Sequence, residues 1–160
     1  MRDSSDVERT AEELRIQADL HPSLQDASTV EAAADALDVD PARIGKSIVL
    51  MVADEEPVVV LVRGPDEVCL EKVAAHVNVD TGEDVRLAEP DEIQAYTGYP
   101  VGAVPPLGHE RPLRTLIDDR VLDQDAVYVG GGSEDVMLEI EAQDLRKLPD
   151  VASGDFVVDE

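Results

Sequence analysis

The 160-residue sequence predicts a single α+β domain in which a mixed, mostly antiparallel, curved sheet is flanked by helices. Two observations carry this prediction. Apolar runs of strand length and segments of helical periodicity follow one another irregularly, which does not match the regular alternation of a parallel βαβ fold. The length suits one domain, and only 2% of the residues are aromatic, so the core must be built from Val, Leu, Ile and Ala.

The first 45 residues predict helices. Apolar residues at helical spacing indicate a first helix over residues 6–20. Ser28 followed by Glu31 resembles a capping box that opens an alanine-rich second helix. Pro41 suits the first turn of a third, short helix, which Gly45 is expected to end.

The centre of the chain predicts two buried strands in a hairpin or side by side, over residues 46–53 and 58–63, because both runs are almost entirely apolar. The remaining elements follow in order along the chain. We expect a helix within 64–77, a strand at 84–89, a short helix at 90–96, strands at 111–119, 126–130 and 136–141, a closing helix at 142–148 and a frayed acidic tail over 149–160. The domain itself is therefore expected to span residues 1–148.

Acidity is the strongest compositional signal. The 37 Asp and Glu residues against 13 Lys and Arg residues give a net charge of −24, and the carboxylates are spread between apolar segments. A folded domain with this surface repels itself, and concentrated salt screens that repulsion. We expect a protein adapted to a salt-rich cytosol, as in halophiles. Only three lysines remain, Lys46, Lys72 and Lys147.

No apolar run reaches membrane-spanning length and no basic-then-apolar leader begins the chain, so the expectation is a cytoplasmic protein without a membrane partner. Cys69 has no companion cysteine for a disulfide. Histidine and cysteine spacings of zinc sites are missing, and we expect neither a metal nor a cofactor. The glycines of residues 130–133 lack a phosphate-loop pattern, so a hairpin turn is favoured there. No serine-nucleophile motif occurs.

Residues 97–109 read TGYPVGAVPPLGH and hold three glycines and three prolines. Proline fixes φ and glycine permits positive φ, so the segment specifies one rigid backbone path. It can turn a corner, or it can form the wall of a site. Lys46 opens a buried strand, where its amino group can reach solvent or can face a phosphate or carbonyl in a pocket.

Taken together, GKSIVL around Lys46, the loop pattern of Thr97, Gly98, Gly102, Pro106 and Gly108, and VYVGGGSEDVMLEIEAQDL resemble the YbaK/EbsC family of aminoacyl-tRNA deacylases. These relate to the editing domain of bacterial prolyl-tRNA synthetases. The resemblance runs from about residue 28 to residue 148. It implies a pocket that hydrolyses the ester of mischarged tRNA, with prolyl-tRNA synthetase or another synthetase as a possible partner.

The resemblance also implies site residues. Lys46 would be the key catalytic residue, and the loop from Gly102 through Ala103 and Val104 to Pro106 would line the aminoacyl pocket. Further substrate contacts are expected from Ser47, Thr97, Gly98, Gly108, His109, Gly130 and Gly131. Independently of the resemblance, Arg111, Arg114 and Arg120 form an arginine cluster close after the loop, where they would guide the tRNA acceptor end. They could equally balance Asp118, which matches a recurring aspartate, and Asp119.

Three positions differ from some members of the family. Gly130 stands in place of a serine, Met137 in place of an aspartate and Leu20 in place of a tyrosine. The edited amino acid therefore stays open, and two functions remain: a trans-acting editing hydrolase, or a module on the same fold that binds an aminoacyl or nucleotide group without turnover. Hydrolysis of another small activated ester is a third, weaker alternative.

Overall fold

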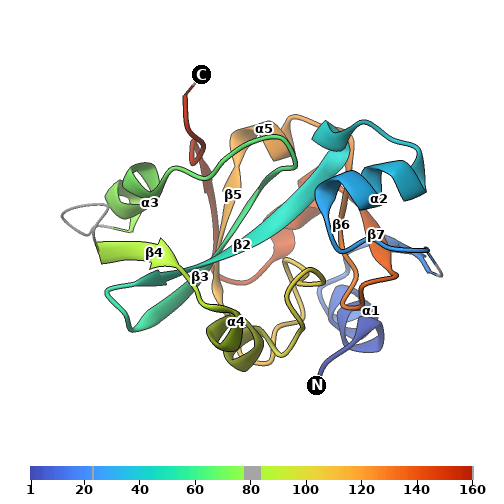
Figure 1. Cartoon of the computed structure of the whole chain (residues 1–160), viewed down its shortest axis with the longest axis horizontal. Helices are drawn as coiled ribbons and strands as arrows, with labels where there is room; N and C mark the ends of the chain where they lie inside the picture. The colour runs from blue at the N-terminus through green and yellow to red at the C-terminus, as the bar shows by residue number, and fades with distance from the viewer. Residues whose placement is uncertain (23, 78–83, 160) are drawn as a thin grey trace.

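The computed structural model describes residues 1–22, 24–77 and 84–159. Its strands form one eight-stranded mixed sheet (Figure 1). The strand order is β1 (Ala18–His21), β7 (Met137–Glu141), β6 (Ala126–Gly130), β2 (Ile44–Val52), β3 (Glu56–Arg63), β5 (Arg114–Asp118) and β8 (Val151–Gly154), and β4 (Val85–Leu87) also pairs with β2. The predicted mixed α/β architecture is confirmed. Antiparallel pairs join β1 to β7, β7 to β6, β2 to β3 and β2 to β4, whereas β2–β6, β3–β5 and β5–β8 are parallel.

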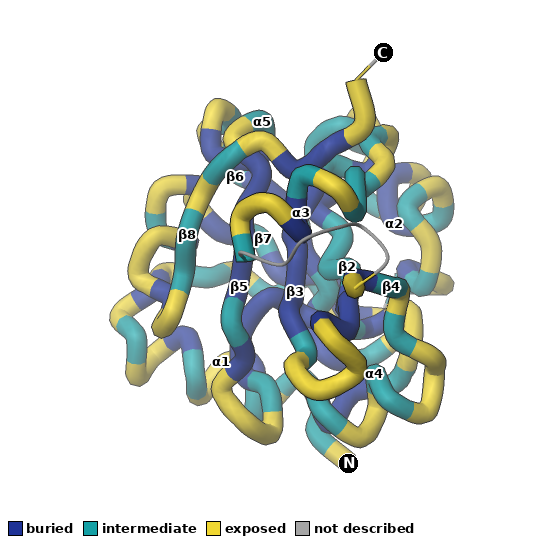
Figure 2. Tube along the Cα trace, turned by 90° about the vertical axis from the view of Figure 1, so that its left-hand side faces the viewer, coloured by how far each residue is buried: buried dark blue, intermediate teal, exposed yellow. Residues whose placement is uncertain are grey.

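The hairpin of β2 (Ile44–Val52) and β3 (Glu56–Arg63) is the centre of the sheet. Ala53 and Asp54 take positive φ of 53° and 57° at its tip, which is the geometry that tight hairpins require. β3 is buried along most of its length, as Figure 2 shows, because its valines and leucine pack on both faces. The two runs predicted as buried neighbouring strands are therefore confirmed.

The other strands extend this hairpin to both sides. One side carries β6 (Ala126–Gly130), β7 (Met137–Glu141) and β1 (Ala18–His21), and the other carries β5 (Arg114–Asp118) and β8 (Val151–Gly154). β4 (Val85–Leu87) pairs with the last residues of β2. The glycine-rich segment between β6 and β7 is the predicted hairpin turn.

Helices cover the sheet and close its ends (Figure 1). The longer ones are α1 (Ser4–Glu13), α2 (Val30–Leu37), α3 (Leu70–His76) and α4 (Pro90–Thr97), with α5 (Asp119–Leu122) as a single turn. The described residues also include two 3-10 helices, Pro41–Arg43 and Ala142–Lys147. The α3 side packs Val73 and Ala74 against Leu50, Val60 and Phe156.

Several predicted elements are corrected near the N-terminus. The first helix ends at Glu13, and Arg15 then takes a positive φ of 60°, which turns the chain into strand β1 instead of continuing the helix to residue 20. The second helix is capped by Thr29, whose side chain accepts the Ala32 N–H at 3.1 Å, and not by Ser28. Gly45 lies inside β2 and ends no helix.

The end of the chain is ordered, contrary to the predicted frayed tail. β8 pairs in parallel with β5, and Phe156 is 1% exposed against the α3 side of the sheet. The Phe156 N–H donates to the Asp118 carboxylate at 2.8 Å, and the Phe156 carbonyl accepts the Cys69 N–H at 2.7 Å. The prediction of a frayed tail rested on the acidic composition of this segment, which nevertheless contains the buried aromatic residue Phe156. The predicted closing helix at 142–148 is a 3-10 helix over Ala142–Lys147.

Candidate functional site

Strand β2 has a gap along one edge. β6 pairs with it only at Ile44 and Gly45, and β4 only from Leu50 to Val52. Among the described residues, no strand pairs with the stretch between them on this edge. A central strand of a sheet is thus locally an edge strand, and such a position leaves backbone N–H and C=O groups available to a ligand.

The backbone N–H and C=O groups of β2 alternate in direction along the strand, and this alternation shows which of them face the gap. The Ile44 carbonyl accepts the Gly64 N–H at 2.7 Å on the β3 side, whereas the Val49 carbonyl accepts the Ala88 N–H at 3.0 Å on the β4 side. Backbone groups of successive residues point to opposite edges, so those of Ser47 face the gap between β6 and β4.

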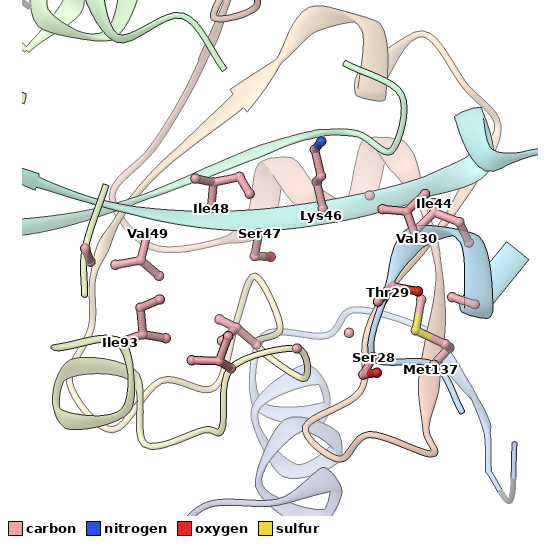
Figure 3. Close-up of a pocket in the computed structure, with 18 of the residues that line it drawn as sticks. Ser28, Thr29, Val30, Ile44, Lys46, Ser47, Ile48, Val49, Ile93 and Met137 are labelled. Carbon is pink, nitrogen blue, oxygen red and sulfur yellow. The ribbon is translucent and has the colours of Figure 1, made fainter. Parts of the chain in front are cut away.

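A cavity of about 390 Å³ opens at this gap (Figure 3). It is enclosed by β2, the start of α2, the β4–α4 segment, the Gly/Pro-rich loop and the β6–β7 hairpin. Because it lies at the edge of β2 and not on one face, residues with opposite side-chain directions all line it, from Ile44 to Val49. The full lining is Ala27, Ser28, Thr29, Val30, Ala33, Ile44, Gly45, Lys46, Ser47, Ile48, Val49, Leu87, Ala88, Ile93, Val101, Gly102, Val104, Gly130 and Met137.

Lys46 and Ser47 lie on the two sides of this edge. In Figure 3 the Ser47 hydroxyl points into the space between β2 and the loop, and the Lys46 side chain leaves β2 on the opposite side. The Ser47 Oγ is buried and finds no hydrogen-bond partner in the described part of the chain, which is costly unless a ligand or water supplies one. No ion pair holds Lys46 among residues 1–22, 24–77 and 84–159.

The Gly/Pro-rich loop is a wall of the cavity, through Val101, Gly102 and Val104. Gly98 ends α4 with a φ of 84°, and Gly102 takes a φ of 91° where a Cβ would lie 3.1 Å from the Ser28 carbonyl oxygen. Both positions therefore need glycine. Ala103, which was predicted to line the aminoacyl pocket, is buried and does not line the cavity.

The β6–β7 hairpin contacts the Gly/Pro-rich loop at Ala103 and Val104 and fixes its position. The Gly132 N–H donates to the Ala103 carbonyl at 3.1 Å, and a Cβ on Gly130 would lie 2.6 Å from the Val104 carbonyl oxygen. A side chain at residue 130 would displace the loop. Gly131 supports the hairpin through its N–H to the Val136 carbonyl and does not line the cavity.

Five further predicted contact residues, besides Ala103 and Gly131, lie away from this cavity. Thr97 is buried and donates its hydroxyl to the Ile93 carbonyl at 2.6 Å, and Gly98 is the cap of the same helix. Pro106, Gly108 and His109 line a second cavity of about 350 Å³ on the α1 side of the loop. These residues shape the loop: the buried Tyr99 hydroxyl donates to the Gly108 carbonyl at 2.6 Å.

His109 is locked to its own loop. Its Nε2 lies 2.7 Å from the Pro105 carbonyl oxygen, so this nitrogen carries the proton and donates it. Burial lowers the pKa of His109 to about 4, although the hydrogen bond to Pro105 opposes the shift. The ring is therefore neutral at pH 7 and braces the loop.

The three arginines predicted to form a cluster are separated. The Arg111 guanidinium lies over the Tyr96 ring, 5.3 Å from its centroid, and Arg114 lies 4.0 Å from Glu56. Arg120 is at the other end of β5 and pairs with the buried Asp118 and with Asp155. Asp118 caps α5 and is structural.

Most of the cavity wall was not predicted from the sequence. The residues missed lie in four regions distant in the chain: Ala27, Ser28, Thr29, Val30 and Ala33 near α2, Ile44, Gly45, Ile48 and Val49 in β2, Leu87, Ala88 and Ile93 around β4 and α4, and Val101 in the Gly/Pro-rich loop. Apolar residues at such positions look like core. The only available signal was the weak family comparison that singled out Met137.

Among the described residues, no group of three or more His, Cys, Asp or Glu side chains lies close enough together to hold a metal ion. No described helix is both long enough and apolar enough to cross a membrane.

Comparison with known proteins identifies the class. Residues 25–148 match the family of aminoacyl-tRNA editing domains, which is more than half of the chain. The protein belongs to this family, as its loop and lysine patterns predicted.

Curated relatives are proline–tRNA ligases. The chain is 37% identical over 102 residues to that of Levilactobacillus brevis, covering 64% of this chain and 17% of the relative. It is 36% identical over 132 residues to that of Solidesulfovibrio magneticus, covering 79% of this chain and 22% of the relative. The chain thus spans about a fifth of the length of these ligases.

Solved structures share the whole fold. The hypothetical protein APE2540 superimposes with a TM-score of 0.88 at 25% identity, covering 96% of this chain and 99% of that one. A candidate trans-editing enzyme for prolyl-tRNA synthetase superimposes with a TM-score of 0.84 at 24% identity, covering 98% and 97% of the two chains. The predicted YbaK-like fold is confirmed.

Proposed function

We propose that the protein is a trans-acting hydrolase that cleaves the ester between a mischarged amino acid and the 3′-terminal adenosine of tRNA. The observation that carries this proposal is the cavity at the open edge of β2, with the unpartnered Ser47 hydroxyl on one side and Lys46 on the other. Membership of the editing-domain family supports the substrate class.

The open edge suits an ester carbonyl. A carbonyl oxygen placed at the gap would accept the Ser47 backbone N–H and the Ser47 hydroxyl proton. Both donors are in place before the reaction, and donors of this kind stabilise the negative charge that develops on the oxygen. The Lys46 side chain is long enough to bring its ammonium to the same edge from the other face and add a full positive charge.

The reaction needs only water and these groups, because an aminoacyl ester is already activated. Water attacks the carbonyl carbon and the C–O bond to the ribose breaks. The proton lost by the water passes to the leaving ribose oxygen, helped by the neighbouring hydroxyl of the substrate. The protein positions the ester and stabilises the tetrahedral intermediate, and these are the two contributions that such a site can make.

The partner would be the acceptor end of tRNA in the cytoplasm, where translation takes place, with prolyl-tRNA synthetase as the first synthetase to consider because the curated relatives are proline–tRNA ligases. Arg111 is the arginine best placed to contact a phosphate. It lies over Tyr96 next to the loop, and no ion pair engages it among the described residues.

A second candidate is a binding module without turnover. It is favoured by the apolar Met137, which lies in the cavity wall where some family members have an aspartate. The experiment that separates the two is deacylation of a panel of tRNAs charged with Ala, Cys, Ser and Thr on matched and mismatched tRNAs, in concentrated KCl. Binding of the same tRNAs through a non-hydrolysable amide linkage is measured in parallel.

Faster hydrolysis of a mischarged species than in buffer alone is the expected result and names the substrate. Binding of the amide analogues without hydrolysis of any ester would instead assign the protein as a binding module. Neither binding nor hydrolysis by the folded protein would contradict both functions.

A further inference from the structure

The cavity lining includes buried and exposed apolar side chains. Ala27, Ala33, Ile44 and Met137 are 6%, 1%, 3% and 3% exposed and pack together. Leu87 and Val101 also line the cavity but are 58% and 49% exposed. Ser47 lies between the two groups, with Met137 and Ile44 on one side of it and Val49 and Ile93 on the other (Figure 3).

The exposure of Leu87 and Val101 is unusual in this molecule. Only four large apolar side chains are prominently exposed in the described part of the chain, and the other two, Met1 and Val158, are close to its ends. Two exposed apolar side chains at the entrance of one cavity mark a contact surface more often than a random surface feature. We call Leu87 and Val101 the apolar mouth.

We propose that the apolar mouth contacts the adenine base of the substrate's terminal nucleotide, a proposal that rests on the proposed function. An ester held at Ser47 has its acyl group on one side and its ribose on the other. The buried group would contact the amino-acid side chain, which is the smaller part of the substrate. The ribose and base would then extend towards the exposed lining residues Leu87 and Val101.

The chemistry of the mouth matches a base and not a phosphate. Adenine has two apolar faces that gain from contact with aliphatic side chains when these lose water. Proteins that bind single-stranded nucleic acid usually offer aromatic platforms, but aromatic residues make up only 2% of this chain. Aliphatic side chains are the contact surface that its composition provides.

The charges around the mouth support the same assignment. Arg86 is next to Leu87 in β4, but its guanidinium is held by both oxygens of Glu92 at 2.8 and 2.9 Å and by Asp54 at 2.7 Å. These bonds leave it unavailable for a phosphate. Glu89, Asp91 and Glu92 add negative charge to the same segment. A neutral base is the part of the nucleotide that this region can accept without repulsion.

The experiment compares two esters of one amino acid, the edited one identified by the panel: the 2′(3′)-aminoacyl adenosine and the aminoacyl methyl ester. The variant is Leu87→Thr with Val101→Thr, which shortens the side chain at position 87 and keeps a β-branched residue at position 101. The matched control is Val158→Thr, another exposed apolar residue that lies outside the cavity.

We expect the wild type and the control to prefer the adenosine ester by about tenfold or more in kcat/KM. Contact with the base would bury about half of the surface of two aliphatic side chains, and burial of this size corresponds to such a preference. The variant should lose that preference, so that its kcat/KM values on the two esters become similar. Thermal unfolding is recorded for each protein, and Val101→Thr alone, which alters only the loop, replaces the double variant if the latter is unfolded at the assay temperature.

Equal rates of the wild type on the two esters, or equal losses of the variant on both, would overturn the assignment of the mouth while hydrolysis of mischarged tRNA still stood. An absence of turnover on every ester, mischarged tRNA included, would overturn the proposed function and the assignment with it.

Discussion

At the scale of single residues, the site depends on the difference between neighbours in β2. The backbone N–H and C=O groups of Ser47 face the unpaired edge, and its buried hydroxyl has no hydrogen-bond partner in the described part of the chain. By contrast, the backbone carbonyls of Ile44 and Val49 accept the N–H groups of Gly64 and Ala88. Lys46 could be singled out from the sequence because lysine is rare in this chain. Ser47 could be inferred only as its neighbour, because the missing strand partner that makes it special is a property of the sheet.

Ser47→Ala should separate activity from stability. Loss of the hydroxyl removes one donor to the ester carbonyl, so kcat/KM should fall about tenfold, which corresponds to about 1.4 kcal/mol. The free energy of unfolding should stay equal or rise by about 1 kcal/mol, since the buried Oγ has no partner to lose.

Urea unfolding and steady-state hydrolysis of the edited aminoacyl-tRNA measure the two effects. Ser153→Ala, at an exposed serine in β8, is the matched control and should change neither. A Ser47→Ala protein that is markedly less stable and equally active would show that the hydroxyl is structural.

At the scale of elements, the sequence predicts what is periodic and misses what depends on a distant partner. The β2–β3 hairpin, the β6–β7 hairpin and α4 are found because apolar runs and Gly or Pro residues mark them. β1 is missed because its helical spacing continues that of α1, and only pairing with β7 decides its conformation. The rigid loop was predicted, but which of its residues face the cavity depends on where α2 and β7 approach it.

Protonation of His109, which belongs to the Gly/Pro-rich loop, should lower the free energy of unfolding in acid. The folded pKa of about 4 lies below the unfolded value of about 6.5, so the unfolded chain binds the extra proton first. Stability from this group is complete above about pH 6.5 and is lost progressively as the pH falls to about 4. The ring keeps some contact with solvent, so we expect a loss of about 2 kcal/mol, less than the full shift implies.

Urea unfolding at several pH values, compared with His109→Gln, isolates this effect from the titration of the carboxylates. The wild type should lose about 2 kcal/mol more than the variant between pH 7 and pH 4. Parallel stability curves for the two proteins would mean that His109 does not titrate between these pH values.

The C-terminal segment should be part of the core. Phe156→Ala removes a ring that is 1% exposed and packs edge-on to His76 at a centroid distance of 5.2 Å. The free energy of unfolding should fall by about 3–5 kcal/mol, as for other buried aromatic truncations. Val158→Ala, at a residue that is 46% exposed, should cost less than about 0.5 kcal/mol. If neither substitution changed the free energy of unfolding, the C-terminal segment would be frayed, as its composition predicted.

At the scale of the whole molecule, the charge of −24 sets how a nucleic acid can be held. Ordinary tRNA binding relies on many Lys and Arg contacts to phosphates and weakens steeply with salt. Here Arg114 and Arg120 have carboxylate partners, and the cavity wall is largely apolar. The composition alone indicates that an acidic surface would repel the phosphates of tRNA. That the arginines lie apart could be seen only in the folded chain.

Binding of tRNA should therefore depend weakly on salt. We expect a slope of log affinity against log salt of about −1, corresponding to one or two phosphate contacts, and Arg111→Ala should bring it close to zero. Titration of the amide-linked aminoacyl-tRNA over a range of KCl concentrations measures the slope. Arg120→Ala is the matched control and should leave it unchanged. A steep slope that Arg111→Ala does not alter would place the phosphate contacts elsewhere.

The central claim is that the open edge of β2 is where the ester is hydrolysed, and single-turnover deacylation of the edited aminoacyl-tRNA by Lys46→Ala tests it most directly. Lys147→Ala, at the half-exposed lysine that pairs with Asp144, is the control. We expect Lys46→Ala to lower the rate by about 100-fold or more, as for loss of one oxyanion-stabilising group, while the control keeps the wild-type rate. Full activity of a folded Lys46→Ala protein would show that the ester is not hydrolysed at this edge with the help of Lys46.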